Sequence, residues 1–189
     1  MDISRITNAW SVDTITDQTV RFVAAGRLHP QKGFDRLIRA LILFKPDYKW
    51  NLTIYGEGAQ RAELQSLIDQ NNLGAQIHLA GLVDEPWADY AQADVFLLPS
   101  RWEGLPNVAL ESLAVGTPVI AMAEAGGIGE IAALGAPGSI KLATSMDDFI
   151  KMMTHVTPNT TTSPRESLLP AEFELRTVIG KFSDFLMPR

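Results

Sequence analysis

Two cations in a glycine-flanked run are the residues best suited to hold a phosphate. Arg27 and Lys32 lie five positions apart in residues 26–33 (GRLHPQKG), after a strand-like segment that ends on Gly26. An arginine binds two phosphate oxygens with its fork of donors, and a lysine supplies a point charge. The helix predicted to begin at Gly33 would add unpaired N–H groups. The run predicts a diphosphate clamp, and the alternative is two surface cations beside a turn.

Two glutamates form the second constellation. Glu103 follows another predicted strand, and Glu111 lies eight residues later inside the next predicted helix. Eight helical residues span roughly 12 Å, whereas two carboxyl groups that act on one glycosidic bond are about 5–10 Å apart. We therefore expect the two carboxylates to contact different parts of one extended ligand, one of them gripping ribose hydroxyls. A helix-start acid and a solvent-facing helical acid are the alternative.

Glycine turns follow two more predicted strands. Residues 55–58 (YGEG) hold Gly56 and Gly58, which would allow the backbone to approach a ligand closely. Residues 125–130 (AGGIGE) open a predicted helix, as a phosphate-binding turn would, but match neither G-x-G-x-x-G nor a Walker loop. A plain turn explains residues 55–58 equally well, and residues 125–130 are a weak signal on their own.

Charge and composition exclude several classes of function. The net charge is −6 and no basic face is visible, so nucleic acid is not an expected partner. There are no cysteines, which excludes disulfides and thiolate metal sites. The three histidines are scattered without metal-ligand spacing, so we expect no metal and no cofactor. No apolar run reaches the length of a membrane span, and the first residues lack a signal-peptide core, so the cytoplasm is the expected compartment.

Strands and helices alternate along the part of the chain that must position these residues. We expect strands at 20–26, 50–56, 76–80, 94–98, 119–122 and 140–142. We expect helices at 33–41, 59–70, 86–92, 106–115, 127–134 and 146–154. This order predicts an α/β fold with a doubly wound parallel sheet of about six strands. Ligands of such sheets sit beyond the carboxyl ends of the strands, where the candidate residues lie.

The ends of the chain differ from this pattern. Residues 1–19 are polar and predict an N-terminal linker, and residues 20–155 form the predicted domain. Residues 156–170 are rich in threonine, serine and proline and predict a second linker. Residues 171–189 carry apolar positions at helical spacing and predict a C-terminal helix that packs on something.

Taken in order, seven short motifs resemble the C-terminal, donor-binding domain of the group 1 glycosyltransferases, family 4 of the retaining enzymes with the GT-B fold. Each is unspecific alone, but their order and spacing over about residues 20–155 are specific. They are GRL…KG at 26–33, IYGEG at 54–58, LAGLV at 79–83, LPS at 98–100, EGLPN…ES at 103–112, GTPVIA at 116–121 and GG…EI at 126–131.

The resemblance implies a role for each matching residue. Arg27 and Lys32 would hold the donor diphosphate and stabilise the leaving nucleotide, and Glu103 would face the donor sugar as the first glutamate of the E-x7-E motif. Glu111, the second, would bind the ribose. The remaining expected donor-binding residues are Gly26, the base-pocket residues Gly56, Gly58, Gly81 and Leu82, and the sugar and phosphate contacts Gly104, Leu105, Pro106 and Asn107.

Two departures from the family pattern bear on function. Gly129 stands where the family often has proline in the run at 126–130, although Glu130 is kept. The N-terminal acceptor domain of the family has no counterpart before Val20. The sequence therefore predicts the donor half of a retaining transferase, which binds a nucleotide sugar and is inactive alone. The acceptor domain would come from the same full-length chain or a separate subunit, and would carry any membrane association.

Three alternatives remain open on the sequence alone. The first is a non-catalytic docking subunit that binds a nucleotide sugar and works with a separate acceptor chain. The second is one half of a GT-B epimerase, and the third is a degenerate domain without a ligand.

Overall fold

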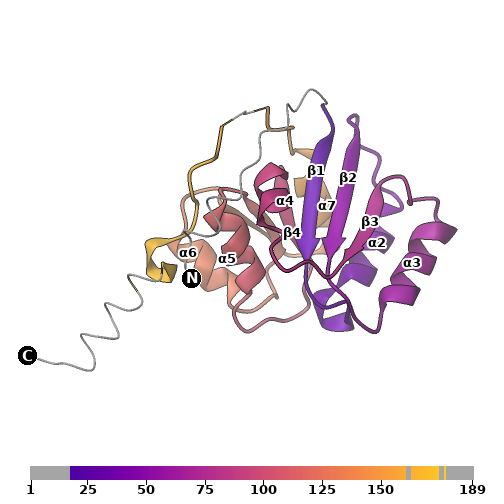
Figure 1. The fold of residues 1–189 in the computed structure, drawn as a ribbon, viewed down its shortest axis with the longest axis horizontal. Coiled ribbons are helices and arrows are strands. Elements are labelled where there is room, and N and C mark those ends of the chain that lie inside the picture. The colour runs from indigo at the N-terminus through magenta and orange to yellow at the C-terminus, as the bar shows by residue number, and fades with distance from the viewer. Residues whose placement is uncertain (1–17, 161–162, 175–176, 178–189) are drawn as a thin grey trace, which may run out of the picture.

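The strand segments assemble into one parallel six-stranded sheet. The computed structural model describes residues 18–160, 163–174 and 177. The strands run in the order β3-β2-β1-β4-β5-β6, which is the order of a Rossmann fold. Figure 1 labels the first four of these strands, β3, β2, β1 and β4. Their bounds are β1 Val20–Ala25, β2 Trp50–Tyr55, β3 Ile77–Gly81, β4 Val95–Leu98, β5 Val119–Met122 and β6 Ile140–Ala143.

Helices connect the strands as the sequence predicts. They are α2 Phe34–Leu41, α3 Arg61–Gln70, α4 Trp87–Gln92, α5 Asn107–Ala114, α6 Ile128–Leu134 and α7 Met146–Thr154, with short 3-10 helices η1 Pro30–Lys32 and η2 Ala171–Phe173. Each predicted strand and helix of the domain is present, and its observed ends fall within two residues of the predicted ones. The doubly wound α/β fold is therefore confirmed.

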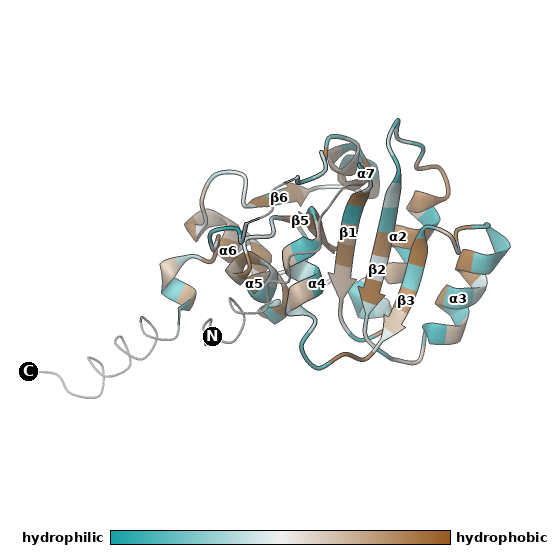
Figure 2. Ribbon diagram, turned by 45° about the horizontal axis from the view of Figure 1, so that its top comes forward, coloured by the Kyte–Doolittle hydropathy of each residue, from teal (hydrophilic) through white to brown (hydrophobic). Residues whose placement is uncertain are grey.

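Each face of the sheet carries its own apolar core. Alternate residues of β1 point to opposite faces, so Phe22 belongs to one core together with Leu37 of α2 and Leu64 of α3, while Val23 belongs to the other together with Leu113 of α5. In Figure 1, α4, α5 and α6 lie to the left of β1, and α2 and α3 lie to its right. All of β4 is buried, as expected of a central strand covered on both faces. Figure 2 shows hydrophobic residues concentrated on the strands and hydrophilic ones on outward-facing helix surfaces.

The predicted second linker is irregular, yet it is fixed to the domain. Arg165 donates to the carbonyls of Ala91 (2.6 Å) and Ala93 (2.8 Å), and its Nη2 also reaches the Thr117 hydroxyl. Leu169 is buried in the core on the α5 face. Of the predicted C-terminal helix, residues 171–173 form η2, and most of the rest lies outside the described residues, as do residues 1–17 of the predicted N-terminal linker.

No helix in the described part of the chain is both long enough and apolar enough to cross a bilayer.

Candidate functional site

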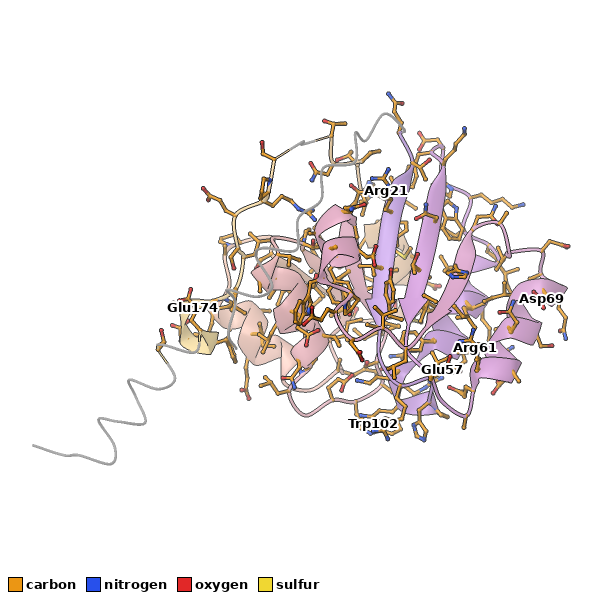
Figure 3. The ribbon with its side chains drawn as sticks, in the orientation of Figure 1. Arg21, Glu57, Arg61, Asp69, Trp102 and Glu174 are labelled. Carbon is orange, nitrogen blue, oxygen red and sulfur yellow. The ribbon has the colours of Figure 1, made fainter. Side chains whose placement is uncertain are left out.

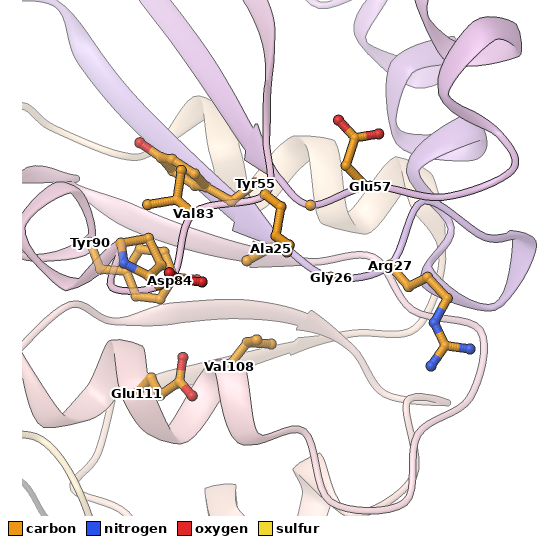
Figure 4. A pocket seen from close by; sticks show the side chains of 13 residues that line it. Ala25, Gly26, Arg27, Tyr55, Glu57, Val83, Asp84, Tyr90, Val108 and Glu111 are labelled. Carbon is orange, nitrogen blue, oxygen red and sulfur yellow. The ribbon is translucent and has the colours of Figure 1, made fainter.

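A pocket of about 390 Å³ opens where the carboxyl ends of the strands meet. The sheet order reverses between β1 and β4, and such a switch point is where open α/β sheets bind ligands. Figure 4 shows Arg27 and Glu111 on different sides of this pocket. Its lining comprises Ala25, Gly26, Arg27, Tyr55, Gly56, Glu57, Leu82, Val83, Asp84, Pro86, Tyr90, Val108 and Glu111.

Arg27 supplies the positive charge of the pocket wall. Its side chain is exposed and makes no hydrogen bond or ion pair with any residue that the structure describes. Gly26 before it has φ +151°, and a Cβ there would lie 3.1 Å from the side-chain carbons of Lys32. The glycine thus lets the lysine chain fold back against the strand end, while Arg27 stays free to meet an anion.

Glu111 supplies the negative charge. It lies on α5, is half-buried, and accepts a hydrogen bond from the Trp87 side chain. Burial raises the pKa of the Glu111 carboxyl, and the Trp87 bond only partly offsets this effect. Burial likewise raises the pKa of the Tyr90 hydroxyl, to which the Glu111 charge contributes. A half-buried acid with one neutral partner is suited to accept hydroxyl donors from a ligand.

Lys32 and Glu103 form an ion pair beside the pocket. The Lys32 Nζ donates to Glu103 Oε1 at 2.6 Å, and the Ser100 hydroxyl donates to the same oxygen at 2.7 Å. The Glu103 side chain is only 7% exposed and that of Lys32 is 17% exposed. The structure gives Glu103 Oε2 no partner among the described residues. Lys32 has two further donor hydrogens, so both members of the pair can still form hydrogen bonds with a ligand.

The loop that carries Glu103 is supported by a glycine turn from the next strand. A Cβ at Gly126 would lie 2.2 Å from the Glu103 carbonyl oxygen, and one at Gly127 would lie 2.4 Å from that of Gly104. The Gly127 amide donates to Gly104 at 3.0 Å. The turn at 125–130 therefore has a structural reason for its glycines, which is close contact with the glutamate loop.

The glycines after β2 also meet the protein's own backbone. A Cβ at Gly56 would lie 2.0 Å from the Gly26 carbonyl oxygen, and one at Gly58 would lie 2.4 Å from that of Leu28. Gly81 has φ +81° and lies at the end of β3, outside the pocket lining. Leu82 and Val83 follow it and present exposed apolar surface to the pocket. The close contacts of Gly56 and Gly58 bring the loops after β1 and β2 together.

The predicted site residues thus divide into two groups. Gly26, Arg27, Gly56, Leu82 and Glu111 line the pocket. The others surround it at the same edge of the sheet without lining it, namely Lys32, Gly58, Gly81, Glu103, Gly104, Leu105, Pro106 and Asn107.

His29 and His78 do not take part in a metal-binding cluster among the described residues. His29 caps η1, since its Nδ1 accepts from the Gln31 amide at 3.3 Å, and His78 is exposed on β3. Within the described residues there is no cluster of three or more histidine or acidic side chains that would hold a metal ion. The expectation that catalysis needs no metal stays a prediction.

Sequence reasoning missed the residues that hold the glutamate loop in place. Arg36 donates to the carbonyls of Pro99 and Ser100, and Arg101 forms a two-bond ion pair with Asp35 at 2.7 and 2.8 Å. Figure 3 shows Trp102 at the lower edge, with Glu57 and Arg61, where the strands end. The contact of Ser100 with Glu103 could have been predicted, because the two residues are only three positions apart. The contacts of Arg36 and Arg101 could not, because their partners are backbone carbonyls or side chains distant in the sequence.

Several proteins of known name are similar to this chain in sequence or in fold. The lipopolysaccharide core biosynthesis glycosyltransferase LpsE of Rhizobium meliloti is 37% identical over 109 residues, which cover 58% of this chain and 31% of LpsE. The lipopolysaccharide outer core galactosyltransferase WaaB has a TM-score of 0.72 at 22% identity, over 93% of this chain and 53% of WaaB. Anabaena HepE, solved with UDP and glucose, has a TM-score of 0.72 at 21% identity, over 98% of this chain and 52% of HepE.

The match therefore spans about a third of LpsE and about half of each of these two solved chains. Residues 11–166 match the family described as "Glycosyl transferases group 1". The chain belongs to the group 1 glycosyl transferase family.

Proposed function

We propose that the pocket binds the nucleoside-diphosphate part of a sugar donor, and that the chain is the donor-binding half of a retaining glycosyltransferase. The observation that supports this most is the pocket itself. It lies at the switch point of the sheet, with a half-buried carboxylate, Glu111, beside it and a cation, Arg27, on its wall that has no partner among the described residues. Leu82, Val83 and Val108 add apolar surface to the same lining.

Each part of the donor has a matching group. The base would rest on the apolar surface of Leu82 and Val83, and the ribose hydroxyls would donate to Glu111. The diphosphate would lie toward Arg27, with Lys32 close behind Gly26. The sugar would then reach Glu103, whose Oε2 accepts a hydroxyl.

Catalysis in this proposal is electrostatic. Negative charge grows on the diphosphate as the bond to the sugar breaks, and cations fixed beforehand stabilise that charge without reorganising. Arg27 offers a planar fork of donors. Lys32 is held by Glu103 at 2.6 Å, so its ammonium is already placed.

The relatives support the class of substrate. HepE was solved with UDP and glucose, and LpsE takes part in lipopolysaccharide core biosynthesis. We propose a hexose-type donor and a glycan or lipid-linked acceptor for this chain. Because the solved relatives are about twice as long, we also propose that a second domain supplies the acceptor site.

Calorimetric titration tests the proposal. UDP, GDP and ADP and their glucose conjugates are titrated into the wild type, Arg27→Ala and Glu111→Gln, without added metal. Arg39→Ala is the matched control, because Arg39 is an arginine 60% exposed on α2 and outside the pocket. We expect one diphosphate to bind, Arg27→Ala to weaken it about tenfold as for a charge-assisted hydrogen bond, and Arg39→Ala to leave it unchanged. A folded chain that binds none of the nucleotides contradicts the proposal.

A further inference from the structure

The loop between β4 and α5 carries Ser100 and Glu103 yet has no regular structure of its own. Its shape must therefore come from contacts with other segments. The strongest of these come from α2, the helix that follows the cation run. Gly33 lets this helix approach, because a Cβ there would lie 2.0 Å from the Pro99 carbonyl oxygen.

Arg36, in the first turn of α2, is the centre of this contact. Its Nε and Nη2 donate to the Pro99 carbonyl at 2.9 and 2.8 Å, and Nη2 also donates to the Ser100 carbonyl at 2.9 Å. Its Nη1 pairs with Glu124 in the loop after β5. The side chain is only 18% exposed, so these bonds are largely shielded from water.

The contact continues to the candidate site through one residue. Arg36 fixes the Ser100 backbone, and the Ser100 hydroxyl donates to Glu103 Oε1 at 2.7 Å. Glu103 in turn holds Lys32 at 2.6 Å. Arg36 itself touches neither Glu103 nor Lys32 in any recorded bond and does not line the pocket.

The guanidinium group has a geometric role that an ammonium could not fill. Its planar fork serves three acceptors at once, on Pro99, Ser100 and Glu124. Glu124 lies just before the glycine turn that packs on the backbone of Glu103. Arg36 therefore joins the loop that carries Glu103 to the loop whose glycine turn packs on it.

We infer that Arg36 is a positioning residue that acts through Ser100 to hold Glu103 toward the donor sugar. This inference rests on the proposed function. Arg36 fixes the sugar end of the site, while Arg27 and Glu111 hold the nucleotide. Loss of Arg36 therefore reduces the extra affinity that the sugar gives. The affinity for the bare nucleoside diphosphate falls less, because Arg27 and Glu111 form no hydrogen bond or ion pair with Arg36 and only Lys32 is reached through Glu103.

The test compares Arg36→Lys and Arg36→Met with Arg39→Met, a control on the exposed side of the same helix. Calorimetry measures affinity for UDP, GDP and ADP and for their glucose conjugates, and urea unfolding measures stability. We expect both Arg36 variants to lose about tenfold of the sugar-dependent affinity, the value of one hydrogen bond to a charged group, with a smaller loss for the diphosphate that binds. Rescue by Arg36→Lys would overturn the role assigned to the fork.

Ser100→Ala keeps the arginine contacts and removes only the hydroxyl bond to Glu103. It should reproduce the selective loss of sugar affinity. Equal losses for diphosphate and sugar conjugate, or no loss, overturn the inference and leave the proposed function standing.

Hydrogen exchange without nucleotide distinguishes a failure of the positioning role of Arg36 from a failure of the proposed function. Arg36→Met should increase exchange in residues 100–106 relative to the wild type and Arg39→Met. An unchanged loop overturns the positioning role whether or not nucleotide binds. Absence of nucleotide binding by the wild type, with a loosened loop in Arg36→Met, overturns the proposed function and the sugar-directed role together, and shows that Arg36 only braces the loop.

Discussion

Asp94 and Glu111 are two carboxyl groups at opposite ends of the strands. Asp94 lies at the amino end of β4, and Glu111 lies on α5 beside the carboxyl ends. Burial raises the pKa of both. Asp94, 7% exposed before β4, accepts from the backbone amides of Arg21, at 2.7 Å, and Asn159, and Arg165 lies close enough to favour its charge. Glu111 has a bond from Trp87 and otherwise faces the pocket.

The comparison separates an acid with a structural role from the acid that we propose binds the ligand. A raised carboxyl pKa marks burial, and by itself it does not mark function. The partners decide, because a carboxylate already supplied with donors has little left to offer a ligand. Figure 3 shows both ends of the strands, with Arg21 at the upper end of β1 and Trp102 at the lower edge.

The largest loss of stability is expected from a substitution of Asp94. Asp94→Ala leaves the amides of Arg21 and Asn159 without their acceptor and Arg165 without its counter-charge. Unsatisfied buried groups of this kind cost about 3 kcal/mol of the free energy of unfolding. Urea unfolding measures it, and nucleotide affinity of the folded fraction should not change. A loss below about 1 kcal/mol in the free energy of unfolding would show that Asp94 does not have this structural role.

Two glycines at the site edge give the next largest effect and its control. Gly56→Ala puts a Cβ 2.0 Å from the Gly26 carbonyl oxygen at φ +132°. Strain of this kind should cost about 2 kcal/mol of the free energy of unfolding. A Cβ at Gly104 meets nothing within 4 Å. The stability of Gly104→Ala should therefore stay within about 0.5 kcal/mol of the wild type. Thermal unfolding compares the two variants, and equal losses would show that Gly104 also has a structural reason.

Glu111→Gln should separate binding from stability. The amide keeps the shape but not the charge that attracts ribose hydroxyls, so nucleotide affinity falls about tenfold, as for a lost bond to a charged group. Stability should not fall, because a buried charge is removed. Calorimetry and urea unfolding on the same variant measure both quantities. A variant with lower stability and unchanged affinity would show that Glu111 has a structural role, as Asp94 does.

The smallest effect is a pH dependence. Burial raises the pKa of Glu111 in the folded state, above its unfolded value of about 4.3. The carboxyl therefore contributes stability below the unfolded pKa, and this contribution is lost as the pH rises through the folded pKa. The unfolding free energy of wild type minus Glu111→Gln should thus decrease from about pH 4 upward, because other groups cancel in the difference. Urea unfolding at several pH values checks the sign, and an increase would contradict the desolvated environment.

Periodicity and turn residues were enough to predict most of the fold. The apolar run at 95–98 and the helical spacing of Phe34, Leu37, Ile38 and Leu41 reflect burial that each segment encodes locally. The seven ordered motifs placed Arg27, Lys32, Glu103 and Glu111 at one edge of the sheet. The packing of residues 163–169 was not anticipated, since a threonine- and serine-rich composition describes local preference and carries no record of distant partners.

The sequence by itself determined the order of strands and helices, the family and the charged residues available at the carboxyl edge. Only the tertiary structure decided which of them act together. It paired Lys32 with Glu103, left Arg27 without a partner among the residues that the structure describes, set Glu111 in the pocket, and placed Arg36 behind the glutamate loop. The physical reason is that secondary structure follows from neighbours in the chain, whereas these contacts join residues more than sixty positions apart once the sheet has formed.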